Sequence, residues 1–269
     1  MSTRTDEELL EATRRGDGQA LDELLTRHEP QVYRFGLRMC GSEEDARDVL
    51  QETLLAAFRE LHAFRGDAAL STWLYQLART HCLRLRRQRV GTPTEFQSLE
   101  SPEAGRVAAE ESLPDARAHA RHLGEVLQAA ILALPEDARE VLILRDVEGL
   151  TAEQAAHVVG IEVRALKSRL HRARLLLREH LATLLGEGAQ GTNPGCPELT
   201  RELSEFATKE VDQATCVRLE EHLSHCARCA GACDELQRTV SLCRRIPGGA
   251  VPATVRAAVR QAMSRTLTD

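Results

Sequence analysis

Residues 150–181, LTAEQAAHVVGIEVRALKSRLHRARLLLREHL, decide the fold predicted for the second half of this chain. Thr151 followed three residues later by Gln154 is a capping box, which predicts that a helix begins directly after Thr151. Gly160 allows a tight turn, and a second helix is predicted to start near Val163. Two helices joined by a short glycine turn form a helix-turn-helix, whose second helix enters the major groove of DNA.

The second of these helices separates apolar from basic side chains. Its apolar stripe is predicted to face inward and consists of Val163, Leu166, Leu170, Ala173 and Leu177. Its polar side chains are predicted to face outward and are Arg164, Lys167, Ser168, Arg169, His171, Arg172 and Arg174. Arginine suits phosphates and the edge of guanine, so the pattern favours DNA binding. The simpler alternative is a solvated basic face.

Residues 6–89 are predicted to be helical throughout, with apolar residues spaced so that they line one side of each helix. Ser42 with Asp45 marks a capped helix start. The last helix of this block passes into a basic tail that contains Arg84, Arg86, Arg87 and Arg89. Four cations within six positions predict a phosphate-binding patch.

The composition indicates an all-α protein, because hydrophobic residues make up 42% but aromatic residues only 3% of its 269 positions. We expect two helical domains followed by a small helical metal-binding domain. The segment after the first block is rich in Pro, Glu, Ser and Gly, as linkers are. The predicted divisions are a helical block over 6–89, a linker over 90–122, a second helical block over 123–185, a flexible joint over 186–195, a cysteine-rich unit over 196–245 and an amphipathic helix over 246–269.

Several classes of protein are not expected. The first residues have no apolar core like that of a signal peptide, and no apolar run approaches the length of about 20 residues that spans a bilayer. We therefore expect a soluble cytoplasmic protein without a membrane partner. In that compartment, the eight cysteines favour metal ligands or redox-active thiols. No catalytic residues, phosphate-binding glycine loop or small-molecule substrate site are visible, so an enzyme is not expected.

Two stretches together resemble a known family. Residues 134–179, LPEDAREVLILRDVEGLTAEQAAHVVGIEVRALKSRLHRARLLLRE, resemble region 4 of the extracytoplasmic-function (ECF) sigma factors of bacterial RNA polymerase. Residues 45–89, DARDVLQETLLAAFRELHAFRGDAALSTWLYQLARTHCLRLRRQR, resemble region 2 of the same family. The resemblance covers about residues 6–185, in the family's order. It implies that core RNA polymerase and promoter DNA are the partners and that the polymerase supplies the chemistry.

The resemblance also implies roles for individual residues. Asp48, Gln51 and Glu52 would dock on the clamp helices of the largest polymerase subunit, although an ordinary acidic helix face is the simpler alternative. Residues 73–89 correspond to the part that opens and reads the −10 element. The −35 element would be contacted from the second helix by Arg164, Lys167, Ser168, Arg169 and Arg172. Thr80 and Arg84 depart from the family pattern and leave the −10 preference open.

The cysteine-rich unit contains a metal-ligand pattern. Cys226 and Cys229 form a CxxC pair, and His222 lies four residues before it, on the same face of a helix. Together with Cys196 the spacing is Cys-x25-His-x3-Cys-x2-Cys, which resembles the zinc-binding anti-sigma domain and implies a Cys₃His zinc site. The alternative is a redox CxxC pair or unrelated buried thiols.

The cysteine-rich unit contains further cysteines that these four ligands do not include, among them Cys233. Cys233 continues the same helical stripe, but the eleven residues from His222 to Cys233 span about 16 Å of helix, too far for one ion. Either the helix breaks near the CxxC pair, or a second site uses Cys233 with Cys216 or Cys243. The surplus resembles the CorE-like ECF sigma factors, whose own cysteine-rich domain senses metal. That resemblance implies control in cis by copper, zinc or cadmium, with the metal left open because histidine disfavours copper(I) only modestly.

Two alternatives to a metal-responsive sigma factor remain. One is a sigma factor with a structural or redox-responsive zinc domain, and the other is a helix-turn-helix repressor that acts without polymerase. The last helix has an apolar face made of Val255, Ala258, Val259, Ala262 and Met263. It is expected either to pack on one of the sigma regions and cover polymerase-binding surface, or to cap its own domain. Cys40 and Cys82 are predicted to be small buried core residues.

Overall fold

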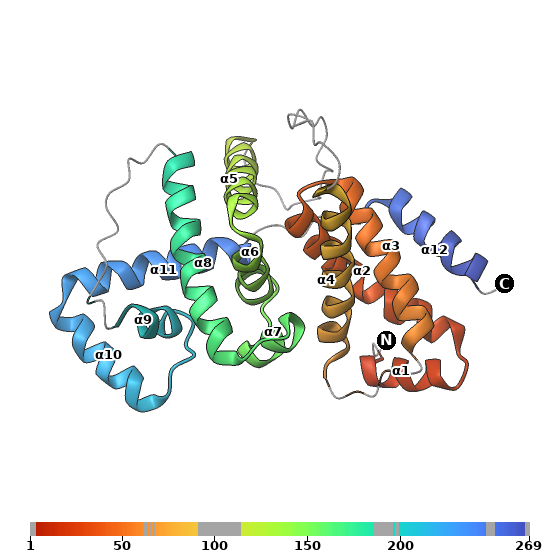
Figure 1. Cartoon of the computed structure of the whole chain (residues 1–269), viewed down its shortest axis with the longest axis horizontal. Helices are drawn as coiled ribbons and strands as arrows, with labels where there is room; N and C mark the ends of the chain where they lie inside the picture. Colours follow the sequence, from red (N-terminus) through yellow and green to blue (C-terminus); the bar gives the residue numbers. More distant parts are fainter. Residues whose placement is uncertain are drawn as a thin grey trace. The chain divides into compact units, whose positions relative to one another are not determined.

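The computed structural model describes residues 4–61, 64, 66, 68–90, 114–185, 196, 199–245 and 251–266, and for 88–90, 114–121 and 262–266 it describes the backbone alone. All regular secondary structure in these residues is helical (Figure 1), as predicted. None of the described helices is long and apolar enough to cross a membrane. The predicted joint over 186–195 lies outside the described residues. So does most of the predicted linker over 90–122, although its last part begins a helix.

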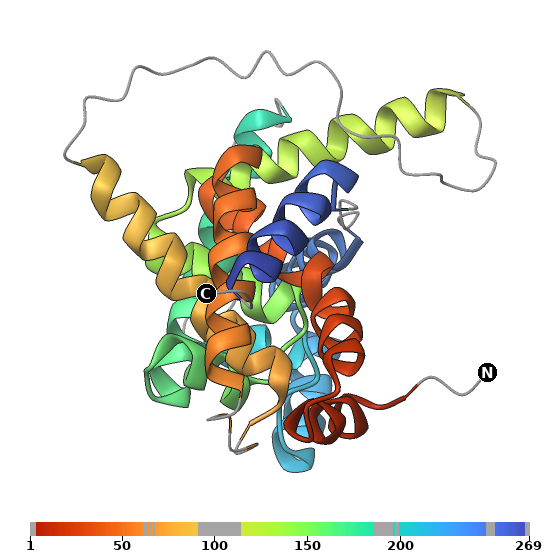
Figure 2. The ribbon, with the colours of Figure 1, turned by 90° about the vertical axis from the view of Figure 1, so that its right-hand side faces the viewer.

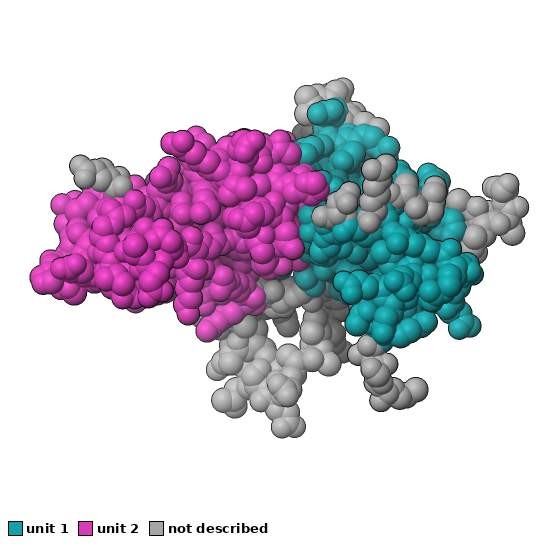
Figure 3. Space-filling view, turned by 90° about the horizontal axis from the view of Figure 1, so that it is seen from below, with its two compact units in different colours: residues 1–112, 248–269 teal, residues 113–247 magenta. Residues whose placement is uncertain are grey.

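The chain forms two compact units, residues 1–112 with 248–269 and residues 113–247 (Figure 3). The helices of the first unit are α1 (Asp6–Arg14), α2 (Gly18–Cys40), α3 (Glu43–Glu60), α4 (Leu70–Val90) and α12 (Ala253–Thr266). The second unit contains α5 (Pro114–Ala133), α6 (Glu136–Leu142), the π-helix η2 (Ile143–Val147), α7 (Ala152–Val159), α8 (Val163–Leu184), α9 (Thr200–Phe206), α10 (Gln213–His225) and α11 (Ala227–Arg245).

The core of the first unit is formed by α2, α3 and α4, which pack on one another. Ser42 caps α3 by accepting a hydrogen bond from the Asp45 N–H at 3.1 Å, as predicted. At Gly36 the backbones of α2 and α3 approach so closely that a Cβ there would lie 3.2 Å from the Cα of Ala46. A larger residue at position 36 would therefore push α2 away from α3.

The C-terminal helix α12 belongs to this first unit and lies along α3 (Figures 1 and 2). Val255 and Val259 are buried, at 4% and 1% exposure, whereas Ala258 of the predicted apolar face is exposed. Arg256 donates a hydrogen bond to Glu29 of α2 at 3.0 Å. Of the packing partners that the sequence left open, the helix packs on the helical block predicted over residues 6–89.

The helix-turn-helix in the second unit has the predicted boundaries. The capping box is complete, because Thr151 accepts from the Gln154 N–H and Gln154 accepts from the Thr151 N–H. Gly160 ends α7 in the left-handed conformation, with φ at +76°, and α8 begins at Val163. The local chemistry of the caps and the turn thus sets both helix ends.

The cysteine-rich helices α9, α10 and α11 belong to the same unit as the helix-turn-helix. Helix α11 packs on η2 and α8, and α9 packs on α8. Their own small core contains Leu203, Leu219, Cys229 and Cys233. The sequence predicted this segment as a separate domain after a joint, whereas in the structure it belongs to one compact unit with the helix-turn-helix.

Candidate metal centre and its contacts with the basic helix

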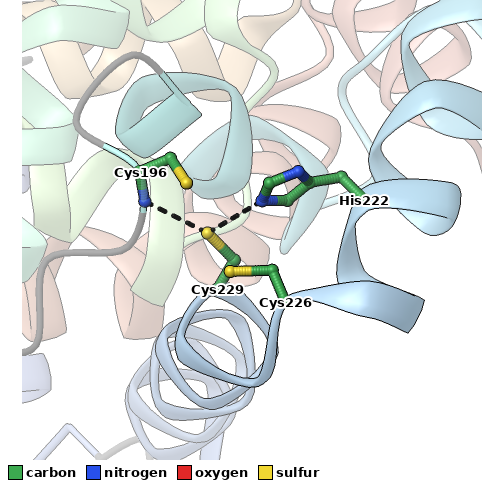
Figure 4. Close-up of side chains that lie close together, drawn as sticks. All are labelled: Cys196, His222, Cys226 and Cys229. Carbon is green, nitrogen blue, oxygen red and sulfur yellow. Dashed lines mark hydrogen bonds between the residues drawn. The ribbon is translucent and has the colours of Figure 1, made fainter.

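Four of the predicted ligands lie together (Figure 4). The ligand atoms of Cys196, His222, Cys226 and Cys229 are all within 4.8 Å of one another. A tetrahedral zinc ion with Zn–S bonds of about 2.3 Å separates its sulfur ligands by about 3.8 Å, so small side-chain movements would close this group on an ion. Three thiols and one imidazole form a donor set that suits divalent zinc.

The helix breaks at the CxxC pair. Helix α10 ends at His225, Cys226 has an extended backbone with φ at −119° and ψ at 92°, and α11 begins one residue later. The change of direction brings His222 Nε2 within 3.2 Å of Cys229 Sγ (Figure 4). The backbone N–H of Cys196 donates to the same sulfur at 3.2 Å. The sequence left open whether the helix breaks near the CxxC pair or a second metal site uses Cys233, and the structure shows the broken helix.

The two thiols of the CxxC pair have pKa values that are shifted in opposite directions. Hydrogen bonds from Cys229, its backbone N–H first and then its side chain, lower the pKa of the Cys226 thiol. Burial raises the pKa of the Cys229 thiol. A half-buried thiol with a lowered pKa next to a buried one provides a first ligand for an incoming cation, because metal ions bind the thiolate.

The other three cysteines predicted as ligands lie outside this group. Cys233 is 3% exposed and packs in the apolar core, while Cys243 is buried near the end of α11, the helix that contacts η2. Cys216 is half-buried on α10 and its thiol donates to Glu220 at 3.4 Å. Within the described residues, Cys196, His222, Cys226 and Cys229 are the potential metal ligands that lie close enough together, as a group of three or more, to hold one ion. Of the cysteines outside the group of four, Cys233 and Cys243 are thus buried packing residues.

The structure separates the residues predicted to contact the −35 element into two sets. Arg164, Ser168 and Arg172 are exposed at i, i+4 and i+8, so they share one face of α8. Lys167 instead forms an ion pair of 2.9 Å with Glu205 of α9. Arg169 lies 3.5 Å from a carboxylate oxygen of Asp137 and 3.7 Å from one of Glu140, both in α6.

The prediction that Arg174 faces outward is wrong. Its side chain is 1% exposed, and its Nε and a terminal nitrogen donate to the two oxygens of buried Asp146 at 2.7 and 2.6 Å. Its other terminal nitrogen donates at 2.8 Å to both the carbonyl and the hydroxyl oxygen of Ser204 in α9. The arginine therefore belongs to the core and connects η2, α8 and α9 through charge-assisted hydrogen bonds.

The cysteine-rich helices contact one flank of α8. The contacts follow a stripe that the sequence analysis missed: Lys167 pairs with Glu205, Arg174 with Ser204 and Arg178 with Glu235 of α11. The three residues lie at i, i+7 and i+11, a spacing that keeps them on one side of a helix. That spacing was visible in the sequence, but Lys167 and Arg174 were predicted to face outward toward DNA or solvent, and Arg178 was not singled out.

In the first unit, the residues predicted to bind polymerase or DNA are mostly at the surface. Asp48 is exposed, and Gln51 and Glu52 are half-buried on α3. Arg84 is exposed and lies 3.4 Å from a carboxylate oxygen of Glu52, so residues from the two predicted sites adjoin. The remaining cations of the basic tail are Arg87, which is exposed, Arg86, which is half-buried, and Arg89, whose side chain lies outside the described residues.

Two aromatic residues of the predicted −10 segment, Trp73 and Tyr75, pack internally. The ring centroid of half-buried Trp73 lies 5.1 Å from that of Phe64, and Tyr75 makes an edge contact with Phe35 at 5.5 Å. Tyr75 is 2% exposed and is a core residue.

Comparison with known proteins identifies the two helical blocks. Residues 24–91 match the family described as sigma-70 region 2, and residues 124–177 match the family described as sigma-70, region 4. The ECF RNA polymerase sigma factor SigE of Mycolicibacterium smegmatis is 34% identical over 65% of this chain and 68% of its own. The ECF RNA polymerase sigma factor SigM of Mycobacterium tuberculosis is 34% identical over 71% of this chain and 89% of its own.

A third relative is matched over nearly its whole length but over only part of this chain. The RNA polymerase sigma-H factor of Pseudomonas aeruginosa is 30% identical over 99% of its own length but only 70% of this chain. Sigma factors are non-catalytic initiation factors that bind core RNA polymerase and promoter DNA, which sets aside the alternative of a repressor that acts without polymerase. The chain belongs to the ECF sigma factors of RNA polymerase.

Proposed function

We propose that this ECF sigma factor is controlled in cis by a metal ion bound at Cys196, His222, Cys226 and Cys229. In the bound form, α9 and α11 are held against the flank of the −35-reading helix α8 and restrain promoter binding. The single observation that carries the proposal is the ion pair between Lys167, a residue expected to contact the −35 element, and Glu205 of α9.

The ligands connect directly to the helices that contact α8. Cys196 precedes α9 by four residues, and its carbonyl accepts a hydrogen bond from the Leu199 N–H at 2.9 Å. Cys229 lies on α11, which carries Glu235, the partner of Arg178. A bound ion would supply the bonds that join these two segments, which are far apart in the sequence. Without it, the short helix α9 is held only by its packing on α8, α10 and α11.

The position of Glu205 gives the restraint a physical basis. It neutralises Lys167, and it places a carboxylate at the flank of a helix that must approach a phosphate backbone. The exposed face with Arg164, Ser168 and Arg172 stays accessible. The domain is therefore proposed to weaken −35 binding, and its release to strengthen it.

Zinc is the proposed resident metal, because a Cys₃His donor set suits it. Copper(I) and cadmium prefer thiolates as well, and either would act by displacing zinc and disturbing the docked geometry. The roles of Asp48, Gln51 and Glu52 in polymerase docking, and of Arg84, Arg86, Arg87 and Arg89 at the −10 element, are part of the same proposal.

Transcription in vitro tests the proposal. Purified polymerase with the wild-type chain should give an output that changes as zinc, copper or cadmium is titrated. The Cys229→Ser variant should lose its bound metal and give a high output that no longer responds. Cys216→Ser is the matched control, because this thiol lies outside the group of four, and it should respond like the wild type.

Two results would count against metal control. One is a flat output for all three metals in a wild-type protein whose metal content does change. The other is disulfide formation with zinc loss under peroxide, accompanied by a change in output that added metal does not reproduce. The second result would favour the redox-responsive domain, which the lowered pKa of the Cys226 thiol also suits.

Replacing Glu205 with glutamine should strengthen binding to −35 DNA by several-fold, because Lys167 becomes available to a phosphate. The slope of log affinity against log salt concentration should steepen by about one unit, as expected for one additional phosphate contact. Glu202→Gln is the matched control: it lies on the same helix but pairs with Arg218 at 2.6 Å. Equal slopes for the wild type and Glu205→Gln would show that Lys167 does not reach DNA.

A further inference from the structure

A pair of thiols in the first unit is independent of the metal centre. Cys40 is the last residue of α2 and Cys82 lies within α4, yet their sulfur atoms are 3.6 Å apart. Cys82 is fully buried, whereas Cys40 is only half-buried. The prediction of small buried core residues therefore fits Cys82, while Cys40 exposes part of its side chain beside it.

We propose that Cys40 and Cys82 are a redox modification site, at which a hydroperoxide forms a reversible disulfide between α2 and α4. The Cys40 thiolate attacks the peroxide, which gives a sulfenic acid and, with hydrogen peroxide, hydroxide ion. The Cys82 sulfur then attacks the Cys40 sulfur, and the sulfenic hydroxyl leaves with the Cys82 proton as water. In total, two thiols lose two electrons and two protons, and hydrogen peroxide is reduced to two molecules of water.

The accessibility of the two thiols assigns the order of these steps. Cys40 is the one that an oxidant from solvent can reach. The hydrogen bond with Cys40, and then burial, raise the pKa of the Cys82 thiol well above its usual value. Cys82 therefore stays protonated and shielded until its neighbour is oxidised, as a resolving cysteine does.

The position of Cys40 allows the closer approach that a bond requires. A disulfide bond is about 2.05 Å long, so the sulfur atoms must approach by about 1.5 Å. Cys40 ends its helix, and Gly41 follows in the left-handed conformation with φ at +82°. The last turn of a helix lacks part of its hydrogen bonding and yields more easily than the interior.

The bond would act on the segment that, under the proposed function, reads the −10 element. Cys82 lies two residues before Arg84, where the basic tail begins. Fixing this part of α4 to the end of α2 restrains the helix that carries these cations. Promoter opening should therefore fall several-fold on oxidation and return on reduction.

The test uses the full-length, zinc-loaded protein treated with graded hydrogen peroxide. Free thiols are then alkylated, and the protein is digested without reduction for mass spectrometry. The expected product is one peptide containing Cys40 joined to one containing Cys82, two hydrogens lighter than the pair, which disappears with dithiothreitol. Cys216→Ser should keep the cross-link, and Cys40→Ser should abolish it.

Promoter opening measured on the same samples separates this site from the metal centre. The wild type and Cys216→Ser should lose opening on oxidation, whereas Cys40→Ser should retain it at peroxide doses that leave the bound zinc in place. Because Cys40 is half-buried at a helix end, this serine variant should fold normally. Separate alkylation of Cys40 and Cys82 after peroxide, or unchanged opening by the cross-linked protein, would overturn the proposal.

Discussion

Arg174→Ala is expected to lower the free energy of unfolding of the unit formed by residues 113–247 by about 3–5 kcal/mol. The substitution leaves the buried carboxylate of Asp146 without its cation and removes both hydrogen bonds to Ser204. A buried charge that has lost its partner carries the desolvation cost without compensation, which is why the loss exceeds that for a surface ion pair. The same change also removes a connection between α8 and the cysteine-rich helices.

Denaturant unfolding of the full chain measures this effect. Arg172→Ala, two positions away on the exposed side of α8, is the matched control and should change stability by less than about 0.5 kcal/mol. The double variant Arg174→Met with Asp146→Leu should recover much of the loss, because no unpaired charge remains. Similar stability of Arg174→Ala and Arg172→Ala would contradict the buried ion pair.

The boundaries of the helix-turn-helix could be predicted from the sequence because they depend on local chemistry. The capping box and the left-handed Gly160 act within a few residues of the helix ends that they define. Arg174 could not be placed in the same way. Its partners lie 28 and 30 residues away in the chain, and the apolar stripe of α8 gives no sign that a basic residue shares its buried face.

The candidate metal site was predictable for a related reason. Cys226 and Cys229 are close in sequence, and His222 is one helical turn away, so spacing alone indicates a shared ion. The length of a helix also excluded Cys233 from that ion. The choice between a broken helix and a second site was left open, because it depends on the extended backbone of Cys226.

The contacts between elements were beyond the reach of the sequence. An apolar stripe on α12 indicates that the helix packs on something, but the pairing of Arg256 with Glu29 joins residues 227 positions apart. Similarly, Cys40 and Cys82 each looked like a core residue, and only the packing of α2 on α4 makes them neighbours. Such long-range pairs are fixed by tertiary structure, which periodicity does not encode.

Val259→Asp is expected to raise the apparent affinity for core polymerase about tenfold and to increase basal transcription. Val259 is 1% exposed on α12, which packs on α3, the helix of the residues proposed to dock on polymerase. A buried aspartate at this position would expel α12 from α3. If the docked helix is favoured by about 1.4 kcal/mol, only about a tenth of the free protein is competent to bind, and release restores the rest.

Ala258→Asp is the matched control, because this neighbouring position is exposed and the same charge there should leave α12 docked. Removal of residues 251–269 should reproduce the effect of Val259→Asp without adding a charge. Burial raises the pKa of the Glu29 carboxylate and Arg256 lowers it, so the departure of α12 would remove the cation that stabilises the charged form of Glu29. If Val259→Asp and the truncated chain bind polymerase no better than Ala258→Asp does, α12 supports the fold of the first unit and does not compete with polymerase.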